Sequence, residues 1–236
     1  MQPTAQAVDP HRNEERAPKG RKNRTVYIPE HFRNEDRATA LAFMRANPFI
    51  ILVSNTETGP FATHVPVIMR ETADNLTIRG HVAKANPHWR YLQTDPQCLL
   101  IFHGPHAYIS PSNYETREVV PTWNYGAVHV YGEARTYSAP EELLSMLHDL
   151  IPTFEAAYGE QWASLSEAYR QRMLSHIVGF EIAVNRLEAK FKLSQNRTRQ
   201  EQQNIIASLG ASPDTAISGT ARLMCDHGLG LKKEKG

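Results

Sequence analysis

The sequence predicts an α+β fold that is mainly β: a small antiparallel barrel, closed or split, with peripheral helices. Two observations predict it. First, six or seven segments rich in β-branched and aromatic residues follow one another through short turns, as in an antiparallel meander. Second, too few helices separate these segments to form the crossovers that parallel strands need. A barrel is favoured over an open sheet because closure leaves no exposed edge strand.

The predicted elements follow from local signals. Pro48 ends a helix expected over residues 35–47, and Asn86 is a suitable N-cap for a short helix that Pro96 ends. β-rich segments predict strands at 49–53, 61–70, 76–81, 98–103, 107–110, 119–137 and 177–184. Further helices are expected after capping-box patterns at 138–141 and 164–167, and at 198–209.

The chain has 236 residues and a net charge of +1, with 26 Lys plus Arg against 25 Asp plus Glu. Without a strong basic excess, any contact with DNA has to depend on a local patch. We expect the folded unit at 25–209, between a disordered N-terminal arm at 1–24 and a flexible C-terminal tail at 210–236. No secretory signal, membrane span or disulfide framework is recognised, so the cytoplasm is the expected location.

Residues 79–89 leave a strand and enter the short helix. Lys84 lies just before the helix start, where unpaired N–H groups suit a phosphate, and His81 shares a strand face with Arg79. The segment predicts either an anion site or an ordinary strand-to-helix turn with a solvated lysine. It lacks the glycines of a P-loop or a dinucleotide fingerprint, which disfavours nucleoside triphosphates and NAD.

Residues 61–67 place a proline, Pro66, within a strand. Such a proline requires a local edge or a bulge, which leaves neighbouring backbone groups available to a flat heteroaromatic ring. A plain edge strand is the alternative. Alternation along the strand separates Thr63 from His64 and Pro66.

Two further segments combine aromatic and polar side chains. Residues 108–125 contain Trp123 and Tyr125, which belong either to a ligand site or dimer contact or to the core. Residues 188–196 place lysines before a helix, which indicates a second anion site or a polar connector. The histidines between 64 and 129 are numerous, but no metal-site spacing is present.

Taken in order, these segments resemble the PaiB-type family of FMN-binding negative transcriptional regulators. The resemblance extends over residues 26–209. One departure is Asn113, at a position where the family pattern has tryptophan. The matching segments are Ala62–Pro66, Gly80–Trp89, Tyr108–Ser112, Val120–Tyr125 with Val128–Gly132, and Lys190–Asn196.

The resemblance implies an FMN-binding split β-barrel and a homodimer with the flavin at the subunit interface. It places His81, Lys84 and Asn86 around the flavin phosphate. The strand that lies along the flavin ring would carry Thr63, His64 and Pro66. The residues that complete the pocket, from the same or the other subunit, would be Trp123, Lys192 and Gln195.

Three functions stay open on the sequence alone. A regulator would contact DNA through the arm or through the basic residues Arg197 and Arg199, although no helix-turn-helix is recognised. An FMN-dependent oxidoreductase would act on a small-molecule substrate through the flavin, with His64, Tyr125 or His129 assisting proton transfer. A haem-binding or haem-degrading protein of the same fold is the third alternative, and only the dense histidines favour it.

Overall fold

The computed structural model describes residues 29, 32–34, 36–72 and 75–231. The predicted disordered arm at 1–24 lies outside the described residues, as do residues 232–236 of the predicted tail.

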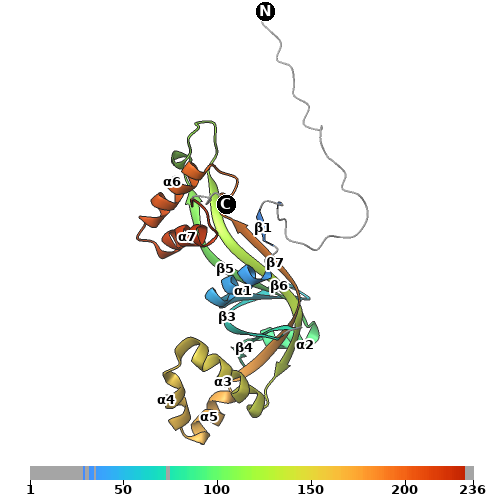
Figure 1. The fold of residues 1–236 in the computed structure, drawn as a ribbon. Coiled ribbons are helices and arrows are strands. Elements are labelled where there is room, and N and C mark those ends of the chain that lie inside the picture. Colours follow the sequence, from blue (N-terminus) through green and yellow to red (C-terminus); the bar gives the residue numbers. More distant parts are fainter. Residues whose placement is uncertain (1–28, 30–31, 35, 73–74, 232–236) are drawn as a thin grey trace, which may run out of the picture.

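In the described part of the chain, a six-stranded antiparallel barrel forms the centre of the molecule (Figure 1). The strands pair in the order β7–β4–β3–β2–β5–β6, the pairing of β6 with β7 closes the ring, and β1 (Arg33–Asn34) adds to β7. The predicted α+β barrel is therefore confirmed. The barrel strands are β2 (Phe49–Thr56), β3 (Gly59–Glu71), β4 (Leu76–Ala83), β5 (Gln97–Ile109), β6 (Thr122–Tyr137) and β7 (Ile177–Lys192).

Alternating side chains build the barrel core. Ile50 and Leu52 of β2 are fully buried, and Leu100 and Val130 occupy equivalent inward positions on β5 and β6. Their neighbours along each strand point to the outer face, because successive side chains of a strand alternate. The barrel therefore has a closed apolar interior and a distinct outer face.

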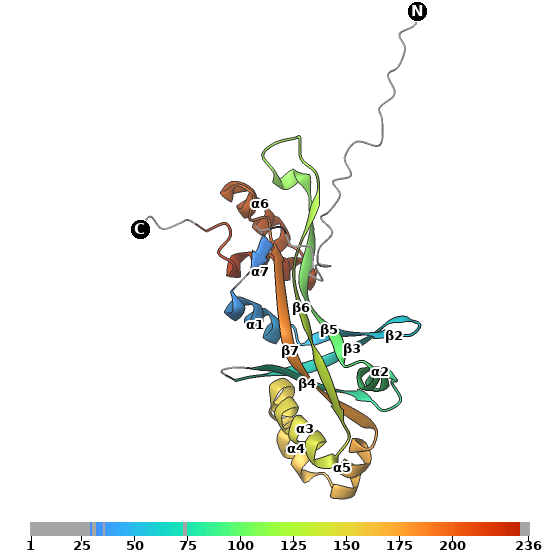
Figure 2. The same cartoon turned by 90° about the vertical axis from the view of Figure 1, so that its right-hand side faces the viewer.

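Three strands extend beyond the barrel. Figure 2 shows β5, β6 and β7 running from the helices α6 (Arg199–Gly210) and α7 (Thr215–Asp226) at one end toward α3 (Pro140–Glu155), α4 (Tyr158–Ser164) and α5 (Glu167–Leu174) at the other. Beyond its pairing with β2, β5 continues with β6 alone, as a hairpin extension with a bulge between His103 and His106. A separate small core beneath α3 and α5 contains Tyr137, Leu143, Met146 and Leu174.

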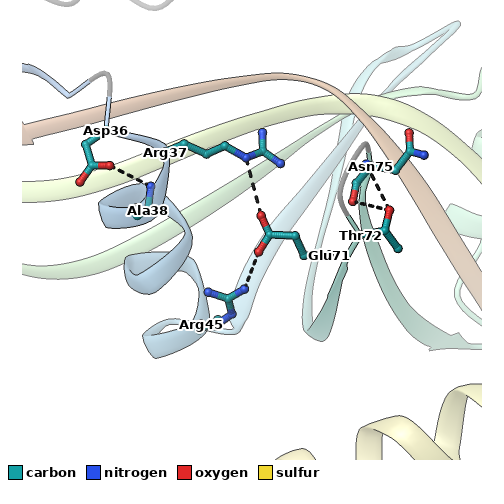
Figure 3. Close-up of polar contacts among 7 residues, drawn as sticks. All are labelled: Asp36, Arg37, Ala38, Arg45, Glu71, Thr72 and Asn75. Atoms are coloured by element: carbon teal, nitrogen blue, oxygen red, sulfur yellow. Dashed lines mark hydrogen bonds and ion pairs between the residues drawn. The ribbon is translucent and has the colours of Figure 1, made fainter.

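Ion pairs connect helix α1 (Arg37–Ala46) to the end of β3. Its N-cap Asp36 accepts a hydrogen bond from the Ala38 N–H at 3.0 Å. Glu71, the last residue of β3, contacts Arg45 at 2.9 Å and Arg37 at 3.7 Å (Figure 3). Because these side chains are substantially exposed, the ion pairs orient α1 more than they stabilise the fold.

The C-terminal part of the chain differs from the expectation. The prediction of a flexible tail from residue 210 is wrong for α7, which packs against α6 and β5. Asp214 caps this helix, and Ala221 and Met224 are buried at helical spacing. The tail contains enough apolar residues on one face to dock, despite its glycines.

Helix starts also differ in detail. The pattern at 138–141 forms no side-chain cap, because the N-cap residue of α3 is Ala139. Ser166, two residues after the predicted Ser164, caps α5, and α4 is an additional helix before it. At α6, Thr198 and Glu201 form a complete capping box.

The short helix α2 (His88–Thr94) is anchored by a buried histidine. The fully buried ring of His88 has Nδ1 2.8 Å from the Thr63 hydroxyl and Nε2 3.0 Å from the Ser54 hydroxyl. Asn86 accepts the His88 N–H at 3.0 Å and donates to the Thr63 hydroxyl at 3.2 Å. Burial lowers the pKa of His88 to about 4. This network joins α2 to two strands of the barrel.

The His88 network predicts a pH-dependent stability. Because the folded pKa of about 4 lies below the ordinary value of 6.5, the unfolded chain binds more protons between these two values. The contribution of His88 to the free energy of unfolding is therefore complete above pH 6.5. It should fall by roughly 3 kcal/mol as the pH drops to about 4. Urea unfolding at a series of pH values measures this decline.

A variant isolates the contribution of this one residue. Burial also lowers the pKa values of His81, His103, His129 and His227, which therefore add to the decline. The difference between the wild type and His88→Gln gives the contribution of His88. An equally steep loss of stability in both proteins would contradict the assignment.

Candidate functional site

The outer face of the barrel carries His64. Strand pairing aligns His64 with Ile51, Ile51 with Ile101, and Ile101 with His129. Residues paired in this way share a face, and all four are exposed or half-buried. The His64 ring stacks on Phe49, which is 63% exposed, at 6.1 Å between ring centroids.

Pro66 lies where β3 gains its second partner. Residues 59–66 of β3 pair with β2, whereas pairing with β4 begins at Val67 opposite Gly80. Pro66 therefore occupies a local edge, as expected for a proline within a strand. In the described part of the chain, the backbone just before Pro66 has no strand partner on the side away from β2. A planar ring could hydrogen-bond there.

Lys84 and Asn86 lie between β4 and α2, beside Thr63. The Lys84 backbone is fixed, because its N–H donates to the His176 carbonyl at 2.7 Å and its carbonyl accepts the Trp89 ring N–H at 3.0 Å. The side chain of Lys84 is exposed and makes no hydrogen bond or ion pair with another described residue. Asn86 holds Thr63 at 3.2 Å. The structure thus brings Asn86 to Thr63, with Lys84 two residues before Asn86 in the same loop.

Other contacts at this corner differ from the sequence-based interpretation. The side chain of Asn86 already accepts the first helical N–H of α2, and α2 has only 7 residues. Arg79 is committed elsewhere, since its buried guanidinium contacts Asp149 of α3 at 2.8 Å and Glu181 at 3.5 Å. Neither the helix start nor Arg79 is therefore available to an anion. Lys84 is the cation that remains.

His81 offers a polar atom without a partner. It is half-buried on the outer face of β4, and its buried Nδ1 has no hydrogen-bond partner among the described residues. His81 pairs in register with Gly179, and the Tyr137 ring lies over the backbone of this glycine. Burial lowers the pKa of His81. Because a buried nitrogen without a partner is unfavourable, this position suits a bound polar group.

Trp123 and Lys192 lie on the outer face of the hairpin extension and the adjoining end of β7. Trp123 is 52% exposed, which excludes a core role. Its ring centroid lies 6.1 Å from that of His106 and 6.0 Å from that of Tyr108. Lys192 pairs with Tyr125 and donates a hydrogen bond to the Thr122 hydroxyl. By strand register Lys192 is level with Tyr125, two residues from Trp123, while its ammonium reaches the Thr122 hydroxyl.

Gln195 has a local structural role. Its side-chain oxygen accepts the Leu193 N–H at 2.7 Å, and its amide donates to the Phe191 carbonyl. These bonds enclose Ser194, whose positive φ of 65° is held by a hydrogen bond to Asn124 at 3.1 Å. Gln195 therefore shapes the loop after Lys192.

The residues around His64 and the residues around Trp123 are separated within one chain. His64 lies level with His129, whereas Trp123 stands six residues earlier on β6, a distance of roughly 20 Å at 3.3 Å per residue. His64, His129 and Trp123 face outward, whereas Thr63 lies on the core face beside His88. The residues around His64 and those around Trp123 therefore do not form one compact cluster within a single chain.

Sequence reasoning missed two residues of this region. Ser54 and His88 hold the loop from the core side, and they are 34 residues apart. His88 stands within the matching segment 80–89, but only the three-dimensional contact with Ser54 and Thr63 reveals its role.

Within the described ranges, no group of three or more His, Cys, Asp and Glu side chains could hold a metal ion. No helix in the same ranges is both long enough and apolar enough to cross a membrane.

Comparison with solved structures concerns the fold. The flavocytochrome Anf3 from Azotobacter vinelandii superposes with a TM-score of 0.55 at 14% identity, covering 70% of this chain and 72% of that one. The FAD- and haem-binding protein from Mycobacterium smegmatis gives 0.53 at 12% identity, covering 68% and 73%. These likenesses confirm the split-barrel fold.

Comparison with sequences concerns the family. Residues 26–186 match the family model described as "Putative FMN-binding domain". "Protease synthase and sporulation protein PAI 2" of Bacillus subtilis is 37% identical over 211 residues, which cover 89% of this chain and 100% of that protein. An uncharacterized protein of Emericella nidulans is 30% identical, covering 76% and 89%. The chain therefore belongs to the PaiB-type family of FMN-binding split-barrel proteins, whose cofactor is FMN.

Proposed function

We propose that the protein is a cytoplasmic homodimer that binds FMN at the interface between its subunits. The observation that carries the proposal is the division of the site into two outward-facing halves about 20 Å apart. A two-fold axis across the outer face would bring Trp123 and Lys192 of one subunit opposite Lys84 of the other. Both cysteines are free thiols, which suits a reducing compartment.

The outer face has the apolar character that a second copy would cover. Phe49 is 63% exposed, and Ile51, Val53 and Ile101 beside it are half-buried. A continuous apolar stripe of this kind is typical of an interaction surface. A dimer formed through it would bury the stripe and enclose the flavin.

The residues at the phosphate end fit FMN. The Lys84 ammonium would form charge-assisted hydrogen bonds to the phosphate, and the unpartnered Nδ1 of His81 could donate a further one. The Thr63–Asn86–His88 network would hold the loop in place during binding.

The ring end fits a flat heteroaromatic group. The unpaired edge of β3 before Pro66 would face the polar rim of the ring, and Trp123 of the partner would cover it. FMN, when bound, supplies the redox chemistry, while the chain binds and orients it. Gln195 would contribute by holding the loop after Lys192 rather than by direct contact.

The charge of Lys84 predicts a specific loss of affinity. Wild-type protein should retain flavin absorption bands after gel filtration with added FMN. Lys84→Ala should raise the FMN dissociation constant tenfold or more, because a hydrogen bond to a charged group contributes about 1.5–3 kcal/mol. The control Arg199→Ala, at the exposed start of α6, should bind as the wild type does. Equal retention in all three proteins would exclude Lys84 from the site.

A shared site predicts complementation between two defective variants. Lys84→Ala and Lys192→Ala homodimers should each lack intact sites. After unfolding and refolding a 1:1 mixture, half of the dimers are mixed, and each mixed dimer has one site with both lysines. About a quarter of all sites should then bind FMN with wild-type affinity. Fluorescence titration measures this fraction, and no recovery would mean that both lysines serve one site within a chain.

A regulatory role is the downstream function that we propose. The Bacillus subtilis relative takes its name from protease synthesis and sporulation. The helices α6 and α7 are joined by only four residues, 211–214, and Arg197 and Arg199 stand at the start of α6. The opposite end is unsuited to DNA, because residues 140–174 contain six carboxylates and two arginines. DNA contact is therefore proposed for α6 and α7.

Direct DNA binding predicts a steep dependence on salt. Anisotropy of a labelled duplex should report binding at low salt, weaker binding as salt rises, and a smaller salt slope in an Arg197→Gln/Arg199→Gln variant. Absence of binding at low salt would exclude direct DNA contact. If NADH or NADPH then reduced bound FMN, the alternative of an FMN-dependent oxidoreductase would be favoured. His129 supports that alternative, since its buried Nδ1 is unpartnered among the described residues of the outer face.

A further inference from the structure

A cavity of about 600 Å³ lies between α1 and α7, apart from the proposed flavin pocket. Ala42, Phe43 and Ala46 of α1 line one side, and Leu223 of α7 lines the other, with Pro105 at the β5 bulge between them. Sites for small molecules are typically concave, mainly apolar and of this volume. The cavity therefore has the size and the lining of a ligand site.

The aromatic ring of Phe43 forms one wall of the cavity. The Phe43 ring covers the bare backbones of Gly104 and Gly126, where an added Cβ would lie 2.6 Å and 2.7 Å from it. Phe43 also meets Phe191 edge-on at 5.1 Å between centroids, and the His227 ring lies 4.4 Å from Phe191. Close packing on three sides holds this wall in place without a ligand.

The mouth of the cavity carries one positive and one negative side chain. Arg222 and Asp226 are one turn apart on α7, and both are exposed lining residues. Within the described ranges, neither forms a side-chain hydrogen bond or an ion pair. The cavity lining thus offers two opposite charges that form no ion pair with each other, although Asp226 acts electrostatically on the adjacent His227.

We propose that this cavity binds a small zwitterion with a large apolar body, of the chemical class of the aromatic α-amino acids. The ligand carboxylate would accept hydrogen bonds from the Arg222 guanidinium, and its ammonium group would face Asp226. The ring would lie against Phe43 and Leu223. A ligand with a single charge would leave one rim charge unpaired beside its head group and would bind less tightly.

Calorimetric titration of the full-length protein tests the proposal with L-phenylalanine as the probe. Phenylacetate lacks the ammonium group and phenethylamine lacks the carboxylate, so these two compounds are matched controls. L-phenylalanine should bind saturably and about tenfold more tightly than either. No saturable binding would overturn the site, and equal binding of the three compounds would overturn the recognition of a zwitterion.

Two pairs of variants test whether the ligand binds in this cavity. Ala46→Trp should fill the cavity and abolish binding, while Ala38→Trp, also exposed on α1 but outside the lining, should leave it unchanged. Arg222→Gln should weaken binding at least tenfold, while Arg199→Gln on α6 should have no effect. Both tryptophan variants replace exposed residues, so they should fold. Undiminished binding in Ala46→Trp would overturn the proposal.

Discussion

The antiparallel pairing of β6 with β7 is the constraint on which the other features depend. These two 16-residue strands close the barrel, and they also carry the helices at both ends of the molecule. Their register shifts between Tyr131 and Gly132, where a Cβ on Gly132 would lie 2.3 Å from the Ala183 carbonyl oxygen. The absence of a side chain at Gly132 therefore allows the two strands to approach closely enough to close the ring.

Closure divides the side chains into two sets and explains the form of the site. Leu52, Leu100 and Val130 fill the interior, so every second residue must face outward. This alternation gathers His64, His129 and Trp123 on one surface although they are distant in sequence. The same strand geometry keeps His64 and Trp123 far apart, since a β-strand cannot fold back within six residues. The proposed dimer would place a second surface against this one and so complete the pocket.

The sequence predicted the barrel well because its signals are local. Pro48, Asn86 and the turn after residue 71 delimit elements through short-range chemistry, and alternation identifies the buried strands. It underestimated β7, because Glu188 and Lys190 on the outer face interrupt the apolar pattern although residues 186–192 pair with β6. It also missed α7, whose buried residues Ala221 and Met224 dock on β5 and α6 rather than following a strong local propensity.

Local motifs in the sequence identified candidate residues for the site, but not the contacts between residues that are distant in sequence. The motif at 80–89 identified Lys84 and Asn86 as candidates, and the structure brings Asn86 to Thr63, whereas the link from His88 to Ser54 depends on tertiary packing. Strand alternation also relates the α1–α7 cavity to the proposed flavin site. Phe191 points toward α1 and α7, and Lys192, the next residue, points to the outer face. Phe191, which packs against the cavity-lining ring of Phe43, and Lys192 of the proposed flavin site are therefore neighbours on β7 that point to opposite faces.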